Sequence, residues 1–600
     1  MKILKLAMLC TIVQVTALFS LDAKNNIIQN VSARKYKSLD GVWQIIIDPL
    51  ENGFYNHSLK PRKNGYFKNE KIKNPDDLIE YNFDHSYQLN VPGDWNTQME
   101  KLYYYEGCIW YKKSFDYREE INGRVYVHFE AVNYECKVYL NGQHLGDHVG
   151  GYTPFSFEVT ELLQKTDNFL IVKVKNSRRR EGVPTINTDW WNYGGITRSV
   201  KLLELPNLFI QDYAIRLSKN EANVIEGWVQ LNGDNLSADV EVSIPELKKK
   251  INIRTNENGF ATFKVKSAIE RWSPENPKLY KIKLVTDRDV LEDEVGFKRI
   301  EVRGTDILLN GKPIFLKGIS IHEEAPFGGG RVTTPEQCRI LLNWAKELGC
   351  NFIRLAHYPH GEHMVKQAEK MGFLIWSEIP VYWTVLFNNN GTYQNAENQL
   401  EEMITRDKNR VGIGLWSVAN ETPVNEERLA FLKKLIAKAR SLDNTRLITA
   451  ALNSQKGQGN NIIIDDQLGK HVDVIGINNY CGWYSKKPGE CGALSWQNKF
   501  DKPVILSEVG AGALVGLHGA VNERWTEEYQ AEVYRHNLRM VENIEFVQGL
   551  SPWILTDFRS PRRNLRHIQM DYNRKGLISD SGIKKEAFYI LQQYYKEKVD

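Results

Sequence analysis

The sequence predicts a multidomain chain of β and α/β class, with two β-sandwiches followed by a C-terminal (β/α)8 barrel. Three observations lead to this prediction. The chain has 600 residues, which is too long for a single hydrophobic core. Its first half consists of short strand-like runs broken by Gly, Asn and Pro, whereas its second half alternates strand-like runs with helical patterns.

The composition is that of a soluble globular protein, with 42% hydrophobic and 25% charged residues. A formal net charge of +4 is small for this length, so the whole chain is not a polyanion binder. The 15 Trp and 28 Tyr suit strands and also provide flat surfaces for sugar rings or bases. Because these aromatics fall in strand-like runs rather than on a basic face, we expect no nucleic acid partner.

Residues 1–23 have the pattern of a secretory signal peptide. Lys2 and Lys5 precede a mainly apolar run from Leu6 to Phe19, and small or polar residues follow it. The apolar run is short for a membrane span, which disfavours the alternative of a retained anchor helix. We therefore expect an exported protein, periplasmic or secreted, that is not held in a membrane after the signal is removed.

Six cysteines follow the predicted signal peptide: Cys108, Cys136, Cys338, Cys350, Cys481 and Cys491. They are sparse and show no CxxC spacing, so neither a structural zinc site nor a disulfide framework is indicated. We expect buried thiols, while an exported chain leaves one or two disulfides open.

The region from residue 24 to 302 divides into two series of strand-like runs. The first, over 24–206, includes "GVWQIII", "RVYVHFEAV" and "FLIVKVKN", with Asn141-Gly142 as a tight hairpin turn. The second, over 207–302, includes "VIEGWVQL", "ADVEVSI" and "LYKIKLV". Each series predicts a β-sandwich, and the second has the length of one immunoglobulin-like domain.

Residues 303–600 contain eight strand-like runs: "IFLKGISIH", "NFIRLAHY", "FLIWSEIP", "GIGLWSVANE", "RLITAAL", "VDVIGINNY", "PVILSEVG" and "LSPWILTDF". Helical patterns such as "PEQCRILLNWAKELG" and "NEERLAFLKKLIAKARSL" lie between them. Eight such units in about 300 residues predict a (β/α)8 barrel. An open doubly wound sheet is the alternative, which we disfavour because no Gly-rich nucleotide loop follows the first strand.

Polar side chains stand at the end of nearly every run: His322, Glu323, Arg354, His357, Glu378, Asn420, Glu421, Asn478, Tyr480, Glu508, Trp553 and Asp557. The carboxyl ends of barrel strands form the working face of such enzymes. Several carboxylates there favour acid/base or nucleophilic chemistry on a sugar, which needs two of them. The residues alone do not say which of the five carboxylates form the pair, and each one has a structural ion pair as its alternative role.

A metal site receives little support. His357, His360 and His363 follow one another at steps of three, but Pro359 interrupts the helix that such spacing would need. We expect no metal and no cofactor.

The order and spacing of several motifs resemble glycoside hydrolase family 2, the group of β-galactosidases, β-mannosidases and β-glucuronidases. These motifs are "VPGDWN", "NTDWWNYGGITRSV", "RWSPENPKLY", "VGFKRIEV", "GISIHEE", "IRLAHYPH", "IWSEIP", "WSVANE" and "ILSEVG". The resemblance covers nearly all of the mature chain. It implies a jelly-roll sugar-binding-like domain over 24–206, an immunoglobulin-like sandwich over 207–302 and a catalytic TIM barrel over 303–600.

The resemblance also implies roles for individual residues. Glu421 in "VANE" corresponds to the acid/base and Glu508 in "LSE" to the nucleophile of a retaining mechanism, in which the two carboxyls lie roughly 5–5.5 Å apart. Asn420 is implied to hold the 2-hydroxyl of the sugar. The further implied substrate-binding residues are Asp189, His322, Arg354, Asn478, Tyr480, Tyr484 and Trp553.

The segment "MDYNRKGLISDSG" bears on the identity of the sugar. In β-glucuronidases an Asn-x-Lys motif contacts the substrate carboxylate, and Asn573 and Lys575 match it. A basic run with Arg559, Arg562, Arg563 and Arg566 precedes the motif and favours an anionic sugar, although a solvated loop would have the same composition. Gln569 stands where the glucuronidase pattern has Arg.

We therefore expect an exo-acting β-glucuronidase that removes terminal β-D-glucuronic acid from glucuronides or uronic-acid-containing glycans. A β-galactosidase or β-galacturonidase of the same family is the alternative, and a carbohydrate-binding protein on an inactive barrel is a third reading. The aglycone and any homo-oligomer are left open by the sequence.

Overall fold

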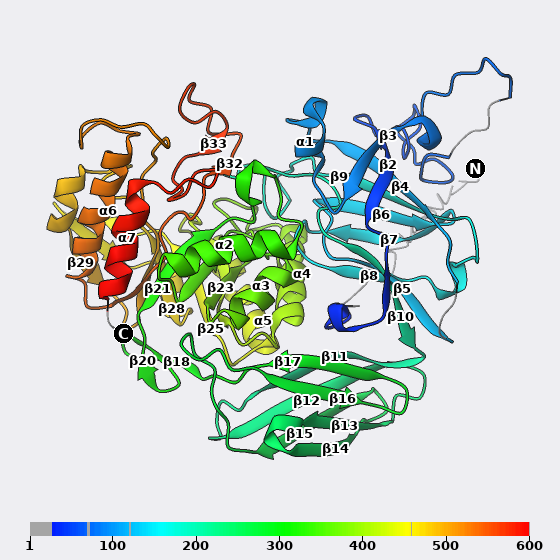
Figure 1. Cartoon of the computed structure of the whole chain (residues 1–600), viewed down its shortest axis with the longest axis horizontal. Coiled ribbons are helices and arrows are strands. Elements are labelled where there is room, and N and C mark those ends of the chain that lie inside the picture. Colours follow the sequence, from blue (N-terminus) through cyan, green and yellow to red (C-terminus); the bar gives the residue numbers. More distant parts are fainter. Residues whose placement is uncertain (1–26, 69–72, 119–121, 458, 599–600) are drawn as a thin grey trace, which may run out of the picture.

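The structure is a computed structural model that describes residues 27–68, 73–118, 122–457 and 459–598. The predicted signal peptide lies outside these ranges. Figure 1 shows two β-sandwiches and a barrel, with the first sandwich beside the barrel and the second below both. The predicted fold class is confirmed.

The first sandwich packs a four-stranded sheet against a six-stranded sheet. In sheet order the strands are β1 (Tyr36–Ser38), β10 (Val200–Pro206), β5 (Gly123–Phe129) and β8 (Phe155–Glu158), and then β3 (Tyr87–Val91), β2 (Gly41–Ile47), β4 (Cys108–Phe115), β9 (Asn168–Lys175), β6 (Glu135–Leu140) and β7 (Gln143–Val149). Asn141 and Gly142 join β6 to β7 with φ values of 50° and 89°. Both lie in the left-handed region that a two-residue hairpin turn requires, as predicted.

The second sandwich has a three-stranded and a four-stranded sheet. Their strands are β11 (Leu208–Leu217), β12 (Val224–Gly233) and β15 (Phe260–Lys266), and β14 (Lys249–Arg254), β13 (Asp239–Ile244), β16 (Tyr280–Val285) and β17 (Val290–Val295). Buried and less buried residues alternate along β13 and β16, because one face of each sheet packs on the core and the other does not.

Eight parallel strands close into the predicted barrel: β21 (Leu316–Ile321), β22 (Phe352–Leu355), β23 (Leu374–Glu378), β24 (Ile413–Asn420), β25 (Leu447–Leu452), β28 (Val474–Asn478), β30 (Val504–Glu508) and β31 (Val547–Leu550). The helices are α2 (Pro335–Glu347), α3 (Glu362–Lys370), α4 (Asn390–Asp407), α5 (Glu426–Leu442), α6 (Glu527–Val541) and α7 (Glu586–Glu597). Because β31 pairs with β21, the sheet has no edge, and the open-sheet alternative is wrong.

The eighth strand ends earlier than its apolar run suggests. β31 stops at Leu550, so Trp553 and Asp557 lie in the long segment that precedes α7. Within this segment β32 (Phe558–Arg559) pairs with β33 (Tyr572–Asn573). Residues 560–571, which connect them, are called the 560–571 loop below.

The first sandwich is fastened to the barrel by buried polar contacts. Arg198 donates to Glu323 at 2.8 Å, and the hydroxyl of Tyr193 donates to Glu324 at 2.9 Å. All four side chains belong to largely buried residues. Since a broken pair would leave a buried charge uncompensated, these contacts fix how the sandwich meets the face of the barrel.

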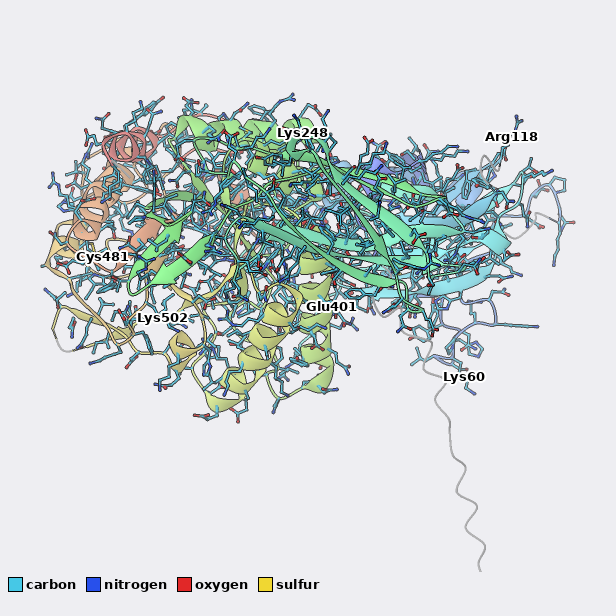
Figure 2. The ribbon with its side chains drawn as sticks, turned by 90° about the horizontal axis from the view of Figure 1, so that it is seen from below. Lys60, Arg118, Lys248, Glu401, Cys481 and Lys502 are labelled. Carbon is cyan, nitrogen blue, oxygen red and sulfur yellow. A yellow bond between two sulfur atoms is a disulfide. The ribbon has the colours of Figure 1, made fainter. Side chains whose placement is uncertain are left out.

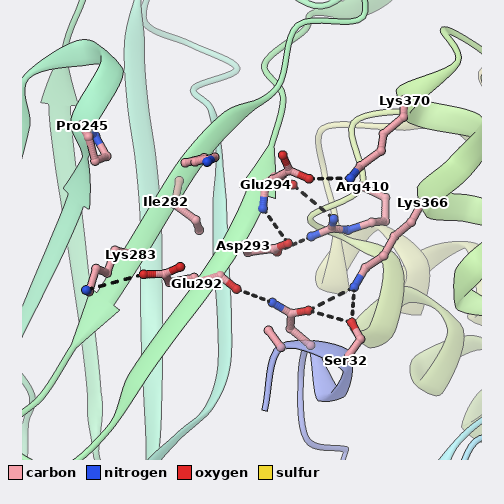
Figure 3. A pocket seen from close by; sticks show the side chains of 13 residues that line it. Ser32, Pro245, Ile282, Lys283, Glu292, Asp293, Glu294, Lys366, Lys370 and Arg410 are labelled. Atoms are coloured by element: carbon pink, nitrogen blue, oxygen red, sulfur yellow. Dashed lines mark hydrogen bonds and ion pairs between the residues drawn. The ribbon is translucent and has the colours of Figure 1, made fainter. Parts of the chain in front are cut away.

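A cavity of about 440 Å³ lies where the second sandwich, the barrel and the first described residues of the chain meet (Figure 3). Across it, Lys370 pairs with Glu294 at 2.5 Å and Arg410 with Asp293. Lys366 donates to Asn30 at 3.0 Å. Because neighbouring chain segments already bind these cations, we interpret the cavity as part of the contact between domains.

Cys481 and Cys491 form a disulfide at the barrel end of the molecule, where Figure 2 labels Cys481. The cysteines at 108, 136, 338 and 350 are buried free thiols, so the expectation of buried thiols holds for these four. The disulfide closes the loop after β28 that carries Tyr484. Within the ranges that the structure describes, no helix combines the length and apolar character needed to cross a membrane.

The double variant Cys481→Ser/Cys491→Ser should lower the apparent melting temperature of the protein. The disulfide joins cysteines 10 residues apart. Without it the unfolded chain gains entropy, which lowers the free energy of unfolding by about 2–3 kcal/mol. Calorimetry with and without dithiothreitol measures the loss. Reductant should lower the melting temperature of the parent protein to that of the variant and leave the melting temperature of the variant unchanged. An equal decrease in both proteins would contradict a stabilising role of the disulfide.

Candidate active site

The side chain of Arg354, near the end of β22, binds several side chains at the carboxyl end of the barrel. It is fully buried and donates to Glu508 at 2.9 Å, Glu378 at 3.0 Å and Asn420 at 2.7 Å. These three acceptors come from β30, β23 and β24. One guanidinium, with its five donors in a rigid plane, therefore fixes side chains from three other strands.

Three of the five candidate carboxylates are committed to neighbouring cations. Glu323 pairs with Arg198 and Arg331, Glu378 with Arg354, and Asp557 with Lys585 and Arg574. Burial alone would raise the pKa of Glu323 and of Glu378, but their cationic partners outweigh it and lower both to about 2. Burial raises the pKa of Asp557 instead, but this carboxylate too is enclosed by protein cations. All three are therefore suited to structural roles, which leaves Glu421 and Glu508.

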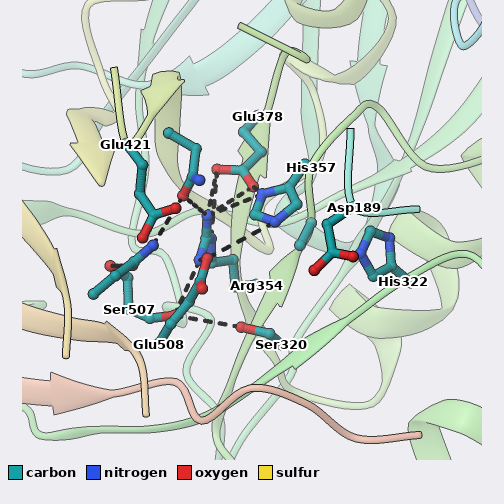
Figure 4. Close-up of polar contacts among 12 residues, drawn as sticks. Asp189, Ser320, His322, Arg354, His357, Glu378, Glu421, Ser507 and Glu508 are labelled. Carbon is teal, nitrogen blue, oxygen red and sulfur yellow. Dashed lines mark hydrogen bonds and ion pairs between the residues drawn. The ribbon is translucent and has the colours of Figure 1, made fainter. Parts of the chain in front are cut away.

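Glu508 and Glu421 approach the same space from β30 and from the residue after β24 (Figure 4). Burial and the charge of Glu421 raise the pKa of Glu508 to about 7, against the opposing effects of Arg354 and Tyr480. Tyr480 donates its hydroxyl to Glu508 at 2.6 Å. Two carboxylates in one buried space thus disfavour the charged form of Glu508.

The hydrogen bonds distinguish the two carboxyls. Glu508 accepts from a guanidinium and a phenol, both of which favour its anion, whereas Glu421 accepts from the indole N–H of Trp383 at 2.8 Å. The hydrogen bonds from Arg354 and Tyr480 therefore favour the anion of Glu508, whereas burial and the charge of Glu421 oppose it and keep the pKa of Glu508 raised.

Asn420 is positioned to offer a donor to a ligand. Its carbonyl oxygen accepts from Arg354 at 2.7 Å and from Asn478 at 3.3 Å. Its buried Nδ2 has no partner among the described residues. Because a buried amide N–H without a partner is costly, this group is a candidate donor to a hydroxyl of a bound sugar.

A second polar cluster lies where the first sandwich meets the 560–571 loop. Asp189 accepts from Ser560 at 2.7 Å, from Asn573 at 3.2 Å and from Arg563. Lys575, the other member of the Asn-x-Lys motif, is 4% exposed. Asn573 is thus held against a carboxylate from a different domain, and Lys575 is buried two residues further along the chain.

The Lys575 ammonium donates to the hydroxyl of Tyr484 at 2.9 Å and lies 5.4 Å from the ring centre of Tyr480. Burial alone would raise the pKa of Tyr484, but the charges of Lys575 and Arg563 outweigh it and lower that pKa. Tyr480 also contacts Glu508. Tyr480 thus connects Glu508 to Lys575, which with Arg563 and Asn573 is called the basic cluster below.

Trp553 and His322 line the side of the site away from Glu421. Trp553 stacks on His357 with ring centres 4.7 Å apart, and His322 lies 5.2 Å from Trp553. In the view of Figure 4, Asp189 and His322 both lie on the side of His357 away from Glu421. Burial lowers the pKa of His322 well below its usual value, so the ring is neutral and acts here as a buried aromatic wall.

Arg559, a predicted substrate-binding residue, lies apart from the others. Its guanidinium donates to Gly328 at 2.9 Å and lies 5.4 Å from the ring centre of Tyr572. Arg563, four residues on, contacts Asp189 instead. No periodic pattern could predict which arginine contacts Asp189, because the paired strands β32 and β33 on either side of the 560–571 loop are only two residues long.

Trp383, which bonds Glu421, was not predicted as a residue of the site, and Glu378, one of the five candidate carboxylates, lies in it as the partner of Arg354. The His series does not form a cluster, since His357 bonds Glu378 at 2.9 Å and His360 bonds the Ala356 carbonyl at 3.0 Å. Among the described residues, no three His, Cys, Asp or Glu side chains gather closely enough to hold a metal ion.

Glu378→Gln should destabilise the protein in a pH-dependent way. The pKa of Glu378 in the fold, about 2, lies below its ordinary value of 4.5, so its ionisation stabilises the fold above pH 4.5 and this contribution disappears as the pH falls toward 2. The variant should lose about 3 kcal/mol at pH 7. Apparent melting temperatures at pH 7 and pH 3 measure the difference.

The exposed Glu257 lies in the β14–β15 connection, and Glu257→Gln is the matched control for Glu378→Gln. The control should melt like the parent protein at both pH values. A Glu378→Gln deficit that stays equal at pH 7 and pH 3 would contradict the assigned ionisation.

The chain is similar to β-glucuronidases and to a β-galacturonidase over most of its length. A putative β-glucuronidase of Formosa agariphila is 29% identical over 568 residues, which span 85% of this chain and 67% of that protein. The structure of Bifidobacterium dentium β-glucuronidase complexed with coumarin-3-O-glucuronide superposes with a TM-score of 0.82 at 24% identity, covering 96% of this chain and 99% of that one.

A β-galacturonidase from Eisenbergiella tayi, bound to galacturonate, also matches, with a TM-score of 0.77 at 24% identity over 95% of this chain and 98% of that one. Family models cover the three domains in order: the sugar-binding domain over residues 36–206, the central domain over 208–298 and the TIM barrel domain over 300–599. The chain therefore belongs to glycosyl hydrolases family 2.

Proposed function

We propose that the chain is an exo-acting β-glucuronidase that removes terminal β-D-glucuronic acid from glucuronides or uronic-acid-containing glycans with retention of configuration. Membership of family 2 and the names of the F. agariphila relative and the B. dentium neighbour support this proposal. The proposed substrate class depends on the basic cluster. The proposed retention of configuration depends on the pair Glu421 and Glu508.

The observation that carries the proposal is the buried ammonium of Lys575. It is 4% exposed and bonds a neutral hydroxyl, and no carboxylate within ion-pair distance of it is recorded among the described residues. A buried charge without a counter-charge is costly. A substrate carboxylate beside Lys575 and Asn573 would supply that counter-charge, which supports a uronic acid over a neutral sugar.

In the proposed double displacement, the Glu508 carboxylate attacks the anomeric carbon while Glu421 gives its proton to the departing glycosidic oxygen. A covalent glycosyl ester on Glu508 results. Glu421, now ionised, takes a proton from a water that attacks the anomeric carbon from the face opposite Glu508. The bond from that carbon to Glu508 breaks, the Glu508 carboxylate is released, and the original configuration is restored. Nδ2 of Asn420 is free to donate to the 2-hydroxyl throughout.

A β-galacturonide remains the second candidate because the E. tayi structure is of a β-galacturonidase. Glucuronate and galacturonate share the carboxylate on C5 and differ at C4, so Lys575 would serve both. Comparing 4-nitrophenyl β-D-glucuronide with the β-D-galacturonide decides between them.

We further propose that the protein is exported to a periplasm or secreted. The basic and apolar pattern of residues 1–23 supports this, as does the Cys481–Cys491 disulfide, because disulfides persist mainly in oxidising compartments. Mass spectrometry of the N-terminus from a culture fraction tests it; an intact residue 1 in the cytosol would contradict it.

Azide should separate the roles of the two glutamates. In Glu508→Ala, azide attacks in place of the missing carboxylate and should yield the α-glucuronyl azide. In Glu421→Ala, azide intercepts the glycosyl ester and should yield the β-azide, with kcat/KM on unactivated substrates lowered about 10²- to 10⁴-fold. The anomeric proton coupling of each product measures the outcome, and exchanged anomers would contradict the assignment.

Lys575→Met should lower kcat/KM for 4-nitrophenyl β-D-glucuronide about 10- to 150-fold, since a hydrogen bond to a charged group contributes about 1.5–3 kcal/mol. Residual cleavage of the neutral β-D-glucoside should stay within about twofold. Lys499→Met removes the same charge from an exposed position before β30, at the opposite end of the barrel. Equal losses on both sugars with Lys575→Met would contradict carboxylate binding.

A further inference from the structure

The side of Glu421 that faces the leaving group is formed by Trp383. The indole N–H of Trp383 donates to Glu421 Oε2 at 2.8 Å. An acid that protonates the glycosidic oxygen must itself touch that oxygen, so a side chain bonded to the acid lies next to the aglycone. This placement rests on the proposed function, in which Glu421 is the acid/base.

The backbone holds Trp383 and Glu421 in fixed register. Trp383 N–H donates to the Asn420 carbonyl, and Asn420 N–H donates to the Val381 carbonyl, both at 2.9 Å. Trp383 and Glu421 have φ values of 53° and 49°, in the left-handed region that bulky side chains rarely adopt. The loops after β23 and β24 thus form one unit that maintains the Trp383–Glu421 contact.

A positive charge lies against this indole. The guanidinium carbon of Arg562 is 4.7 Å from the centre of the Trp383 ring, a cation–π contact. Asn187, from the first sandwich, accepts a hydrogen bond from Arg562. One indole ring therefore separates the Arg562 guanidinium from the Glu421 carboxyl.

The charge of Arg562 is uncompensated, unlike that of its neighbour. Arg563 is paired with Asp189, whereas no carboxylate within ion-pair distance of Arg562 is recorded in the described part of the chain, and Arg562 is exposed. Two contacts, one from the barrel and one from the first sandwich, hold the guanidinium in place while leaving N–H donors open to solvent. A positioned guanidinium with free donors binds carboxylates and sulfates in a bidentate manner.

We propose that Arg562 is a specificity-determining residue of the leaving-group subsite, and that the enzyme selects glucuronides whose aglycone carries an anionic group next to the cleaved bond. The anion is a carboxylate, as in a uronate, or a sulfate ester, since both offer paired oxygens to the guanidinium fork. Trp383 supports Arg562 from below and bonds the acid that protonates the same aglycone.

The test compares aryl β-D-glucuronides that differ only in the para group of the aglycone. The 4-carboxyphenyl and 4-sulfophenyl substrates carry the anion, and the 4-carbamoylphenyl substrate is the neutral reference. The ratio of kcat/KM for each anionic substrate to that for the reference is measured in the parent enzyme and in Arg562→Gln. Differences in leaving-group reactivity cancel between the two enzymes.

Arg562→Gln should lower this ratio about two- to fivefold, which is the range for an ion pair at an exposed site. Raising the salt from 0.05 to 0.5 M should shrink the parent's preference. Arg562→Lys, which keeps the charge and loses the fork, should fall between the two. A loss with only one anionic substrate identifies that anion as the one selected.

The matched control is Arg288→Gln, which removes an equal charge from an exposed turn between β16 and β17 and should leave the ratio unchanged. An unchanged ratio in Arg562→Gln with both anions would overturn the proposal. Failure of the parent enzyme to cleave the neutral reference and 4-nitrophenyl β-D-glucuronide would instead overturn the proposed function, so the two failures are distinguishable.

Discussion

A buried guanidinium in the middle of a parallel barrel is the constraint on which the rest of the site depends. Arg354 is surrounded by Glu378, Glu508 and Asn420, and each acceptor removes part of the cost of burying its charge. In return Arg354 fixes the rotamers of all three. Glu378 balances the charge of Arg354, and the hydrogen bond from Arg354 to Glu508 opposes the burial that raises the pKa of Glu508.

The carboxylate pair and the basic cluster are built from different parts of the molecule. The pair belongs to the ends of β24 and β30, whereas the cluster belongs to the segment after β31 and is held by Asp189 of the first sandwich. Asn187 of the same sandwich holds Arg562. In the proposed function the barrel supplies the reacting carboxylates, and the contact between two domains orients the basic groups that would select the substrate.

Much of this could be predicted from the sequence because it depends on periodic patterns and on motifs within single strands. The eight apolar runs predicted the eight barrel strands, and the family resemblance pointed to Glu421 and Glu508, which the fold brings to one space. Residues on irregular segments could not be placed. The position of Trp383 depends on a left-handed backbone conformation, and the positions of Arg559 and Arg563 depend on a strand of two residues. Neither feature has a periodic sequence pattern. The early end of β31, before Asp557, could not be predicted for the same reason.

The account requires one sugar ring to meet Glu508 at its anomeric carbon, Glu421 at its glycosidic oxygen and Lys575 at its carboxylate. A crystal structure of the Glu421→Gln variant with an uncleaved aryl β-D-glucuronide measures all three contacts at once. We predict that the anomeric carbon lies against Glu508 and that the substrate carboxylate bonds Lys575 and Asn573. A bound glucuronide whose carboxylate points away from Lys575, or whose anomeric carbon does not reach Glu508, would contradict the account.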